Sequence, residues 1–418
     1  MTDSQNPPPT GLGAVAGLRL AVLALGTFVI STGAYVLAGL LPSIQEELDA
    51  TAAEVGQLTF AYTIAYAAWA PLSGVLTRQW DRRLTLLTGL GLFAAGTAMT
   101  AMATSYTEMT ISRALAGAGA GMFTPAASAA AVELVPARWR GRAVAAVISG
   151  LAAATVLAVP VGNVVSGAVG FRPVLWAVVA LSAGAGLALT ALPALKPAAG
   201  GRTRTEITAS ASAAAPLLAV SLLVSISDFA VYTYVVPLLE YLLTTDGTTI
   251  AVLLFLYGCA GVSGNLLGGQ LADRWGPSRT VVTSLALLGA STVATPWTRN
   301  IVLVSVIVVV WGVSGWMVVP ALQSEIIALR PSAAGLLATA NASMIYTGMA
   351  LGSLLGGTVM TTMSPSALGP VGTGAAVLAL LLYLARHRQA SNATASPLDS
   401  AAERQDPGSA EPASHGRS

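Results

Sequence analysis

The sequence predicts an all-α membrane protein whose twelve transmembrane helices form two pseudo-symmetric six-helix bundles. Of its 418 residues, 55% are hydrophobic and only 9% are charged, and the mean hydropathy is +0.73. A water-soluble protein has about 25% charged residues. A large soluble helical core is excluded because almost no polar helix faces are left to meet water. Twelve apolar runs and an internal repeat of 195 residues complete the prediction.

Each apolar run approaches the length of about 20 residues that a helix needs to cross a bilayer. The runs are 18–41, 54–77, 84–104, 107–134, 143–168, 172–195, 215–241, 250–272, 279–298, 301–328, 333–361 and 367–385. The longest polar break separates the first six runs from the last six, and the C-terminal end is rich in Ser, Ala, Pro and charge, a composition typical of disorder. We therefore expect a cytoplasmic N-terminal tail, a bundle, a cytoplasmic linker, a second bundle and a disordered cytoplasmic tail, at 1–16, 17–195, 196–214, 215–387 and 388–418.

Basic residues are distributed very unevenly between the two sets of loops. If the N-terminus is cytoplasmic, the outer loops hold only Arg172 and Arg299. The cytoplasmic loops and tails then hold Arg78, Arg82, Arg83, Arg138, Arg140, Arg142, Lys196, Arg202, Arg204, Arg274, Arg279, Arg330, Arg386 and Arg388. An excess of Lys and Arg marks the cytoplasmic side. We expect a multi-pass protein of the cell membrane with both termini in the cytoplasm.

Landmark residues recur at a near-constant spacing in the two halves. The pairs separated by 195 residues are Pro42 and Pro237, Gly74 and Gly269, and Pro125 and Pro320. The pairs separated by 194 residues are Gly141 and Gly335, Ser149 and Ser343, and Gly162 and Gly356. Internal repeats of this kind are typical of membrane transporters, in which the substrate site lies at the midplane between the halves.

The charged stretch GQLADRWGPSR, at 269–279, interrupts two apolar runs on the cytoplasmic side. Its acid, Asp273, can face the positive N-terminal end of the helix that begins near Arg142, and its arginines can hold the loop at the anionic inner leaflet. The alternative is a solvated turn that only obeys the charge rule. A first-half copy, GVLTRQWDRR, has Arg78 where the acid belongs, so we expect the second copy to carry more of a gate. The gating candidates are Gly269, Asp273, Arg274, Gly276, Arg279, Arg82 and Arg83.

The pattern G-x-L-A-D-R-x-G-P-x-R resembles the signature loop of the major facilitator superfamily, which helps to close the cytoplasmic face. The stretch ISRALAGAGAGMFTPAA resembles the pattern of proton-coupled members, and FAVYTYVVPLLE looks like the twelve-span drug and sugar efflux group. The stretch SGLAAATVLAVPVGN resembles the antiporter motif, with Ala158 in place of one glycine but with Pro160 and Gly162 retained. The W-x-R-R form of the first-half loop is similar to that of chloramphenicol-type exporters. The resemblance implies the major facilitator fold and a drug:proton antiporter.

Asp228 is the clearest candidate for proton coupling. It lies near the middle of the run 215–241, and Ser221, Ser225, Asp228 and Tyr232 share one helical face. A charge inside a span costs roughly 2.5–3.5 kcal/mol and usually has a purpose. A carboxyl that gains and loses a proton as a cavity opens to each side can couple proton entry to substrate exit. The alternative is a structural hydrogen bond to a neighbouring helix.

Arg113 is the second coupling candidate, and Gly117 and Gly121 on its face leave room for a partner helix or a water path. The alternative is an arginine that snorkels to the outer headgroups; the resemblance favours the functional reading. Relatives of the chloramphenicol type carry an acid in the first span, where this chain has Gly33 and Ala34, so more of the coupling falls on Asp228. Plausible cavity residues, which could equally be packing residues, are Ser225, Tyr232, Tyr234, Trp311, Trp316, Asn341 and Tyr346.

These observations predict a secondary transporter that exports a small amphipathic organic compound, antibiotic or sugar-like, in exchange for protons by alternating access. We expect its partners to be the substrate, protons and the lipid bilayer, with no nucleic acid and no cofactor, and we expect a monomer. The first alternative is a proton symporter that imports a nutrient. A membrane sensor or scaffold is a weaker alternative. We do not expect an enzyme, because the sequence has no metal cluster, catalytic triad or nucleotide-binding loop.

Overall fold

The computed structural model describes residues 14–136, 139–195, 204–244 and 247–402, and over these residues it is helical without strands. The first half contains α1 (Ala14–Leu48), α2 (Ala52–Leu76), α3 (Arg82–Met102), α4 (Tyr106–Glu133), α5 (Arg140–Val169) and α6 (Phe171–Thr190). The second half contains α7 (Arg204–Tyr232), α8 (Val235–Leu243), α9 (Gly247–Trp275), α10 (Pro277–Val293), α11 (Ile301–Leu329), α12 (Ala334–Thr362) and α13 (Leu368–Ala402). Twelve of these described helices are long and one, α8, is short.

Each predicted apolar run coincides with a long helix, except that the run 215–241 is divided into α7 and α8. Pro237 explains the break, because it has no N–H to donate to the carbonyl of Thr233 four residues earlier. By length and composition, eleven of the described helices can cross a membrane. The exception among the long helices is α2, which is long enough at 25 residues but less apolar. It packs between α4 and α12, inside the protein.

Two boundaries differ from those expected. The linker predicted at 196–214 is shorter, because α7 already begins at Arg204. The last helix, α13, continues to Ala402, into the segment where the sequence predicts a disordered tail. A helix that is already nucleated in the membrane adds residues at little cost, and Ala, Arg and Gln are good helix formers. Residues 1–13 of the expected N-terminal tail and 403–418 of the expected C-terminal tail lie outside the described residues.

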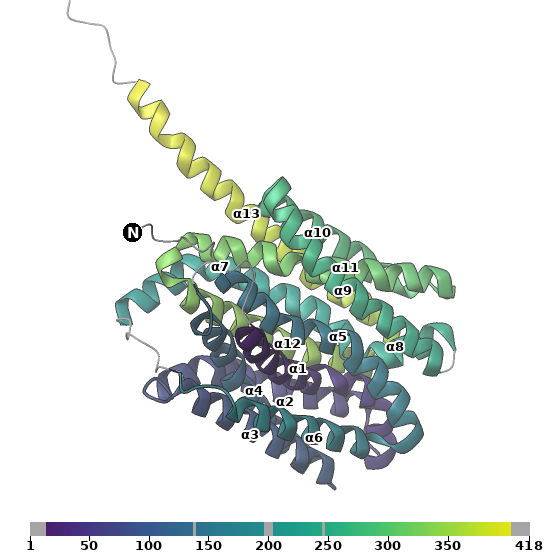
Figure 1. Cartoon of the computed structure of the whole chain (residues 1–418). Coiled ribbons are helices and arrows are strands. Elements are labelled where there is room, and N and C mark those ends of the chain that lie inside the picture. Colours follow the sequence, from purple (N-terminus) through teal and green to yellow (C-terminus); the bar gives the residue numbers. More distant parts are fainter. Residues whose placement is uncertain (1–13, 137–138, 196–203, 245–246, 403–418) are drawn as a thin grey trace, which may run out of the picture.

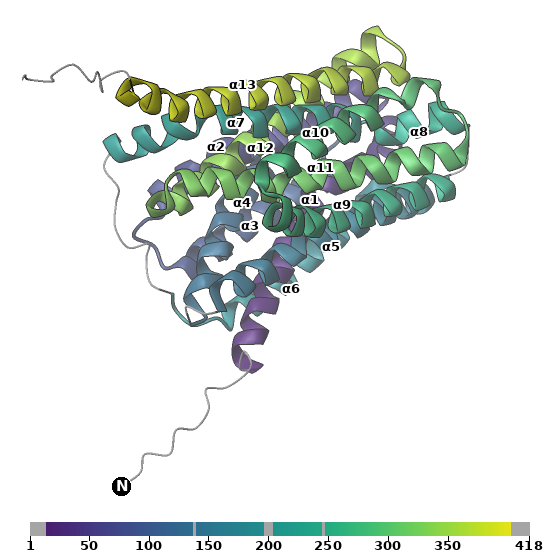
Figure 2. The same cartoon turned by 90° about the horizontal axis from the view of Figure 1, so that it is seen from above.

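The two halves use the same helix pairs. In the first half α1 packs on α5 and α3 on α6, and in the second half α7 packs on α12 and α10 on α13. The halves meet where α2 packs on α12 and α5 packs on α9 (Figures 1 and 2). The approach at this interface is close, since a Cβ added at Gly258 of α9 would lie 2.7 Å from the carbonyl oxygen of Thr155 of α5. The fold is the predicted pair of pseudo-symmetric bundles.

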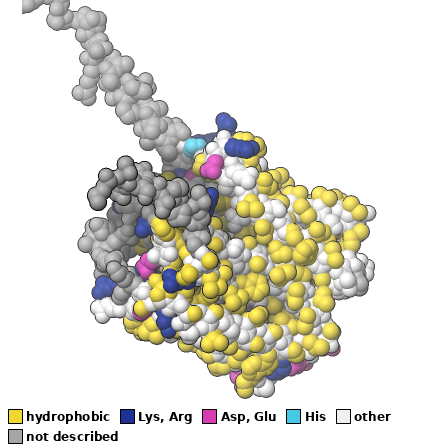
Figure 3. Space-filling model, in the orientation of Figure 1, with side chains coloured by type: hydrophobic (Ala, Val, Ile, Leu, Met, Phe, Trp, Pro, Cys, Tyr) yellow, Lys and Arg dark blue, Asp and Glu magenta, His cyan; other side chains and the backbone are white. Residues whose placement is uncertain are grey.

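Hydrophobic side chains cover the flank of the molecule that faces the viewer in Figure 3, and charged side chains gather toward its ends. Large apolar side chains such as those of Leu187, Val302 and Leu266 are 65–74% exposed. Such an apolar flank is suited to contact with lipid acyl chains.

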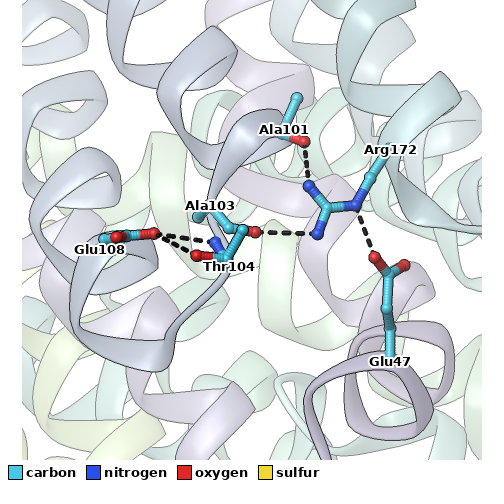
Figure 4. Close-up of polar contacts among 6 residues, drawn as sticks. All are labelled: Glu47, Ala101, Ala103, Thr104, Glu108 and Arg172. Atoms are coloured by element: carbon cyan, nitrogen blue, oxygen red, sulfur yellow. Dashed lines mark hydrogen bonds and ion pairs between the residues drawn. The ribbon is translucent and has the colours of Figure 1, made fainter.

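Arg172 fastens the outer end of the first half. Its guanidinium donates to the carboxylate of Glu47 at 2.5 Å and to the carbonyl oxygens of Ala101 at 2.6 Å and Ala103 at 2.9 Å (Figure 4). These carbonyls lie at the C-terminal end of α3, where a helix leaves its last carbonyl groups without partners. Arg172 therefore joins the outer ends of α1, α3 and α6.

Candidate functional site between the two bundles

Asp228 lies on α7 and is held by two neutral donors from neighbouring helices. The indole Nε1–H of Trp311 on α11 donates to Oδ1 at 2.7 Å, and the hydroxyl of Tyr257 on α9 donates to the two carboxylate oxygens at 3.2 and 3.3 Å. Among the described residues, no Lys or Arg forms an ion pair with it. The structural hydrogen bonds considered as the alternative role are thus present, and proton coupling stays a prediction.

The polar face of α7 points toward other helices. Ser221 donates to the side-chain oxygen of Asn341 on α12 at 2.6 Å, and Ser225 is buried against Gly348 of the same helix. Further along the face, Asp228 meets α9 and α11. This face is therefore covered by other helices, and the structure brings Asn341 and Trp311 to it.

Aromatic rings cross the interface between the halves. The ring of Tyr35 on α1 lies 5.8 Å from that of Tyr232 in an edge-on arrangement, 6.2 Å from that of Phe229 and 6.3 Å from that of Trp316, measured between centroids. Tyr66 on α2 and Tyr346 on α12 are stacked with centroids 3.4 Å apart and an angle of 12° between the rings. We call these rings the aromatic layer; its members are Tyr35, Tyr66, Phe229, Tyr232, Trp316 and Tyr346.

The aromatic layer reaches the surroundings of Asp228 through Tyr232. The centroid of the Tyr232 ring lies 5.1 Å from that of Tyr257 and 6.4 Å from that of Trp311, the two donors to the carboxylate. One continuous set of ring contacts therefore leads from Tyr35 in the first half to Asp228 in the second.

Tyr234, a predicted cavity residue, lies outside the aromatic layer. Its hydroxyl donates to the carbonyl oxygen of Ser353 at 3.0 Å, and the hydroxyl of Ser353 donates to the carbonyl oxygen of Gly56 at 2.6 Å. Gly56 lies in the outer turns of α2, so Tyr234 belongs to an outer contact between the halves and makes no ring contact with the aromatic layer among the described residues.

Arg113 is fully buried within the first half, so the alternative of snorkelling to the headgroups is wrong. One guanidinium N–H donates to the carbonyl oxygen of Gly33 on α1 at 2.7 Å, and the guanidinium carbon lies 4.4 Å from the centre of the Tyr62 ring. Its Nε and Nη1 have no partner among the described residues. The expected partner helix is α2, whose backbone at Tyr62 lies so close to Gly117 that no Cβ fits there.

The sites of Arg113 and Asp228 are built on equivalent positions of the repeat. Gly33 and Asp228 lie 195 residues apart, and so do Tyr62 and Tyr257. In each half a tyrosine approaches the first helix of the bundle, because the Tyr62 hydroxyl donates to the carbonyl oxygen of Ile30 at 3.1 Å. Tyr257 and Tyr66 were not predicted as site residues, although the 195-residue spacing from Tyr62 could have identified Tyr257.

The predicted contact of the second-half loop is not present in this conformation. Asp273, Arg274 and Arg279 are exposed, and Asp273 forms no ion pair or hydrogen bond with the described residues of α5 or any other helix. Gly276 has a φ of +86° at the turn into α10, a conformation that favours glycine, and Gly269 has open space around it. The gating role of this loop stays a prediction.

The first-half loop is fastened within its own half. Arg82 forms an ion pair with Glu133 at 2.6 Å, and Arg83 donates to the carbonyl oxygen of Leu192 at 3.0 Å. Asp81 caps α3 by accepting from the N–H of Arg83 at 2.8 Å, and it also accepts from the N–H of Leu195 at 3.1 Å. These contacts tie α3, α4 and the end of α6 together at one end of the first half.

The antiporter-like segment lies at the contact between α5 and α1. Pro160 and Gly162 are buried there, and a Cβ at Gly162 would lie 2.9 Å from the side chain of Val36. A cavity of about 530 Å³ opens near the outer ends of these helices and borders α8 and α9 of the other half. Its lining includes Asn163, Glu46 and Glu240.

Comparison with known proteins identifies the family. The family model described as Major Facilitator Superfamily matches residues 23–345 and 217–405. The chain is 32% identical to a chloramphenicol resistance protein of Streptomyces lividans, over 91% of this chain and 99% of the relative. It is 31% identical to the inner membrane transport protein YdhP of Escherichia coli, over 88% and 96%, and 27% identical to the uncharacterized MFS-type transporter YbcL of Bacillus subtilis, over 89% and 97%.

A solved structure shows the same fold. The crystal structure of the human organic anion transporter MFSD10 (TETRAN) matches 90% of this chain and 100% of its own, with a TM-score of 0.69 and 18% identity. The resemblance predicted from the loop and span motifs is confirmed. The chain belongs to the Major Facilitator Superfamily of multi-pass membrane transporters.

Proposed function

We propose that this transporter exports a small amphipathic organic compound, uncharged or weakly charged, across the cell membrane in exchange for protons. The observation that carries the proposal is Asp228, a carboxyl group near the middle of a span that has only neutral donors around it. A carboxyl without a fixed counter-charge can be neutralised by a proton and charged again when the proton leaves. The full-length similarity to a chloramphenicol resistance protein supports export of an organic compound.

The proposed mechanism also requires alternating access, in which the site opens to one side of the membrane at a time. The halves touch at an outer contact through Ser353 and Gly56 and, nearer the middle, through the aromatic layer. If the bundles rock about the aromatic layer, these contacts break and form in turn, so that the space beside Asp228 opens to one side at a time. A protonated Asp228 crosses this cycle without net charge, and a deprotonated one attracts the next proton.

Arg113 carries a permanent positive charge in the first half, and we assign it a role other than carrying the proton. It is separated from Asp228 by the division between the bundles and forms no ion pair with any described acid. Its two free N–H directions can hold water or an acceptor oxygen during the cycle. We therefore assign to Arg113 the stabilisation of a polar path in the first half and to Asp228 the transfer of the proton.

The free energy released by proton entry is sufficient to drive export of a neutral substrate. One proton that enters down ~150 mV releases roughly 3.5 kcal/mol, since 100 mV corresponds to about 2.3 kcal/mol per charge. At about 1.4 kcal/mol per tenfold, this sustains a gradient of roughly a few hundredfold for a neutral substrate. The proposal needs one chain, because both bundles and the two donors to Asp228 lie in it. We expect a monomer with both termini in the cytoplasm, for which substrate, protons and lipid suffice as partners, without nucleic acid or a cofactor.

Transport in inverted vesicles tests the proposal. Chloramphenicol and a panel of uncharged antibiotics are assayed for accumulation driven by an imposed pH gradient, with the parent chain, Asp228→Asn and the control Asp49→Asn, whose side chain is exposed in the loop after α1. The parent and the control should accumulate at least one compound, and Asp228→Asn should accumulate none above the level without a gradient. Accumulation by Asp228→Asn at the parental rate would refute the coupling role. Uptake only in right-side-out vesicles would favour the symport alternative.

A further inference from the structure

The aromatic layer has a feature that packing between two rocking bundles does not require. Tyr66 and Tyr346 face one another as flat, nearly parallel rings at 3.4 Å, the thickness of one aromatic ring. Aromatic pairs in proteins usually prefer offset or edge-on arrangements with centroids 4.5–7 Å apart, as the other rings of the layer show. The two tyrosines come from different halves, one from α2 and one from α12, so they must part whenever the halves separate along this seam.

The stacked pair occupies the middle of that seam. Tyr66 and Tyr346 each lie near the middle of their helices. Above them, the seam is closed by the hydrogen bond from Ser353 to Gly56. The pair therefore has to separate before anything can enter the middle of this seam.

The chemistry of the layer selects a flat and uncharged occupant. All six side chains of the aromatic layer are neutral rings, and the nearest carboxyl, that of Asp228, is separated from Tyr35 by the ring of Tyr232 and is already bonded to Trp311 and Tyr257. When the two tyrosines part, each leaves an apolar face that a planar ring covers better than a saturated ring does.

We infer that Tyr66 and Tyr346 form a sandwich site for a planar, uncharged aromatic ring of the substrate, which inserts between them when the bundles part. The inference rests on the proposed export function and narrows its substrate from amphipathic compounds in general to aromatic ones. In the absence of substrate, the two tyrosines take the place of the bound ring by stacking on each other. A sugar without an aromatic group lacks the flat face that this site requires.

Binding to the purified full-length chain in lipid nanodiscs tests the inference. The probes are radiolabelled triethylene glycol mono-2-naphthyl ether and its decahydronaphthyl counterpart, two uncharged compounds with the same skeleton, and binding to empty nanodiscs is subtracted. The variants are Tyr346→Leu, Tyr346→Phe, Tyr66→Leu and Tyr66→Phe, with Trp176→Leu as the control because Trp176 lies exposed on α6. Elution as a single monodisperse peak shows that a variant is folded.

The parent and the control should bind the naphthyl ether at least about tenfold more tightly than the decahydronaphthyl ether, as expected for stacking on two faces. Each Leu variant should lose about tenfold for the naphthyl ether and less than about twofold for the saturated one, and each Phe variant should stay within about threefold of the parent. Equal affinity of the parent for both probes, or folded Leu variants that bind like the parent, would overturn the inference. So would absence of naphthyl ether binding by the parent.

The assay also separates this inference from the proposed function. Binding in nanodiscs needs no pH gradient, so a failure of proton-driven export in vesicles leaves the sandwich site intact if the naphthyl ether still binds. Conversely, proton-driven export that depends on Asp228, together with equal binding of the two probes, would keep the transport proposal and remove the sandwich site.

Discussion

The two halves of the molecule share a frame of packing residues but carry ionisable groups of opposite sign on different helices of that frame. In the first half, Arg113 donates to the backbone of Gly33 beside Tyr62; in the second, Asp228 stands at the position equivalent to Gly33 and accepts from Tyr257. The tyrosines Tyr62 and Tyr257 occupy equivalent positions, whereas the ionisable residue lies on α4 in the first half and on α7 in the second. The comparison teaches that the repeat conserves helix packing and that the chemistry can diverge on top of it.

Replacing Arg113 should have the largest effect on this comparison. In Arg113→Lys the charge is kept, but an ammonium group cannot both reach Gly33 and spread over the Tyr62 ring as a guanidinium does. We expect the export rate in the inverted-vesicle assay to fall by at least about tenfold, which corresponds to a loss of about 1.4 kcal/mol. The exposed Arg330→Lys is the matched control and should stay near the parental rate. Parental export by Arg113→Lys would show that charge alone is needed in the first half.

The shared frame can be tested at equivalent glycines. A Cβ at Gly117 would lie 2.0 Å from the carbonyl oxygen of Tyr62, and a Cβ at Gly312 would lie 2.8 Å from that of Tyr257. Both alanine variants should lower the melting temperature, and Gly117→Ala should lower it more, because overpacking of about 1–3 kcal/mol grows with the clash. Gly91→Ala has open space and should match or exceed the parent. A larger drop in melting temperature for Gly312→Ala than for Gly117→Ala would mean that the two halves are not packed alike.

The equivalent tyrosines should differ in function although they match in position. Tyr257→Phe removes a donor to a carboxyl group, and Tyr62→Phe removes a donor to a backbone carbonyl. A hydrogen bond to a charged group is stronger than one between neutral groups, and in the proposed cycle the Asp228 carboxyl is charged only part of the time. We expect Tyr257→Phe to reduce proton-driven export about three- to tenfold, with Tyr62→Phe within about twofold of the parent. Equal effects of the two variants would remove Tyr257 from the coupling site.

The sequence predicted the frame better than the site. Apolar runs located every long helix, and the spacing of Ser221, Ser225 and Asp228 placed them on one face of α7. What it did not predict depends on distances between helices. Trp311 was named only as a lining residue, because its bond to Asp228 is set by how α11 packs on α7. The stacking of Tyr66 on Tyr346 likewise needs the register of α2 against α12.

Two other expectations depend on features that a sequence pattern does not describe. Whether Asp273 contacts α5 depends on the conformation that the bundles adopt, and one sequence serves every conformation of the cycle. The composition beyond residue 388 is typical of disorder, but its attachment to a membrane helix supplies a helix nucleus that a free peptide of the same composition lacks.

The smallest expected effect concerns the outer ends of the two halves. Arg172 in the first half donates to Glu47 and to two carbonyl oxygens, whereas Arg299 in the second donates to the carbonyl oxygen of Tyr241 at 2.9 Å and covers its ring at 4.8 Å. Both groups are partly exposed, and an exposed ion pair contributes at most about 1 kcal/mol. The melting temperature should therefore fall by only a few degrees in Arg172→Gln and by less in Arg299→Gln. A larger drop in melting temperature for Arg299→Gln would indicate that the stability of the second half depends more on its outer end. The nearby hydrogen bond between Tyr234 and Ser353 would then be the next contact to test.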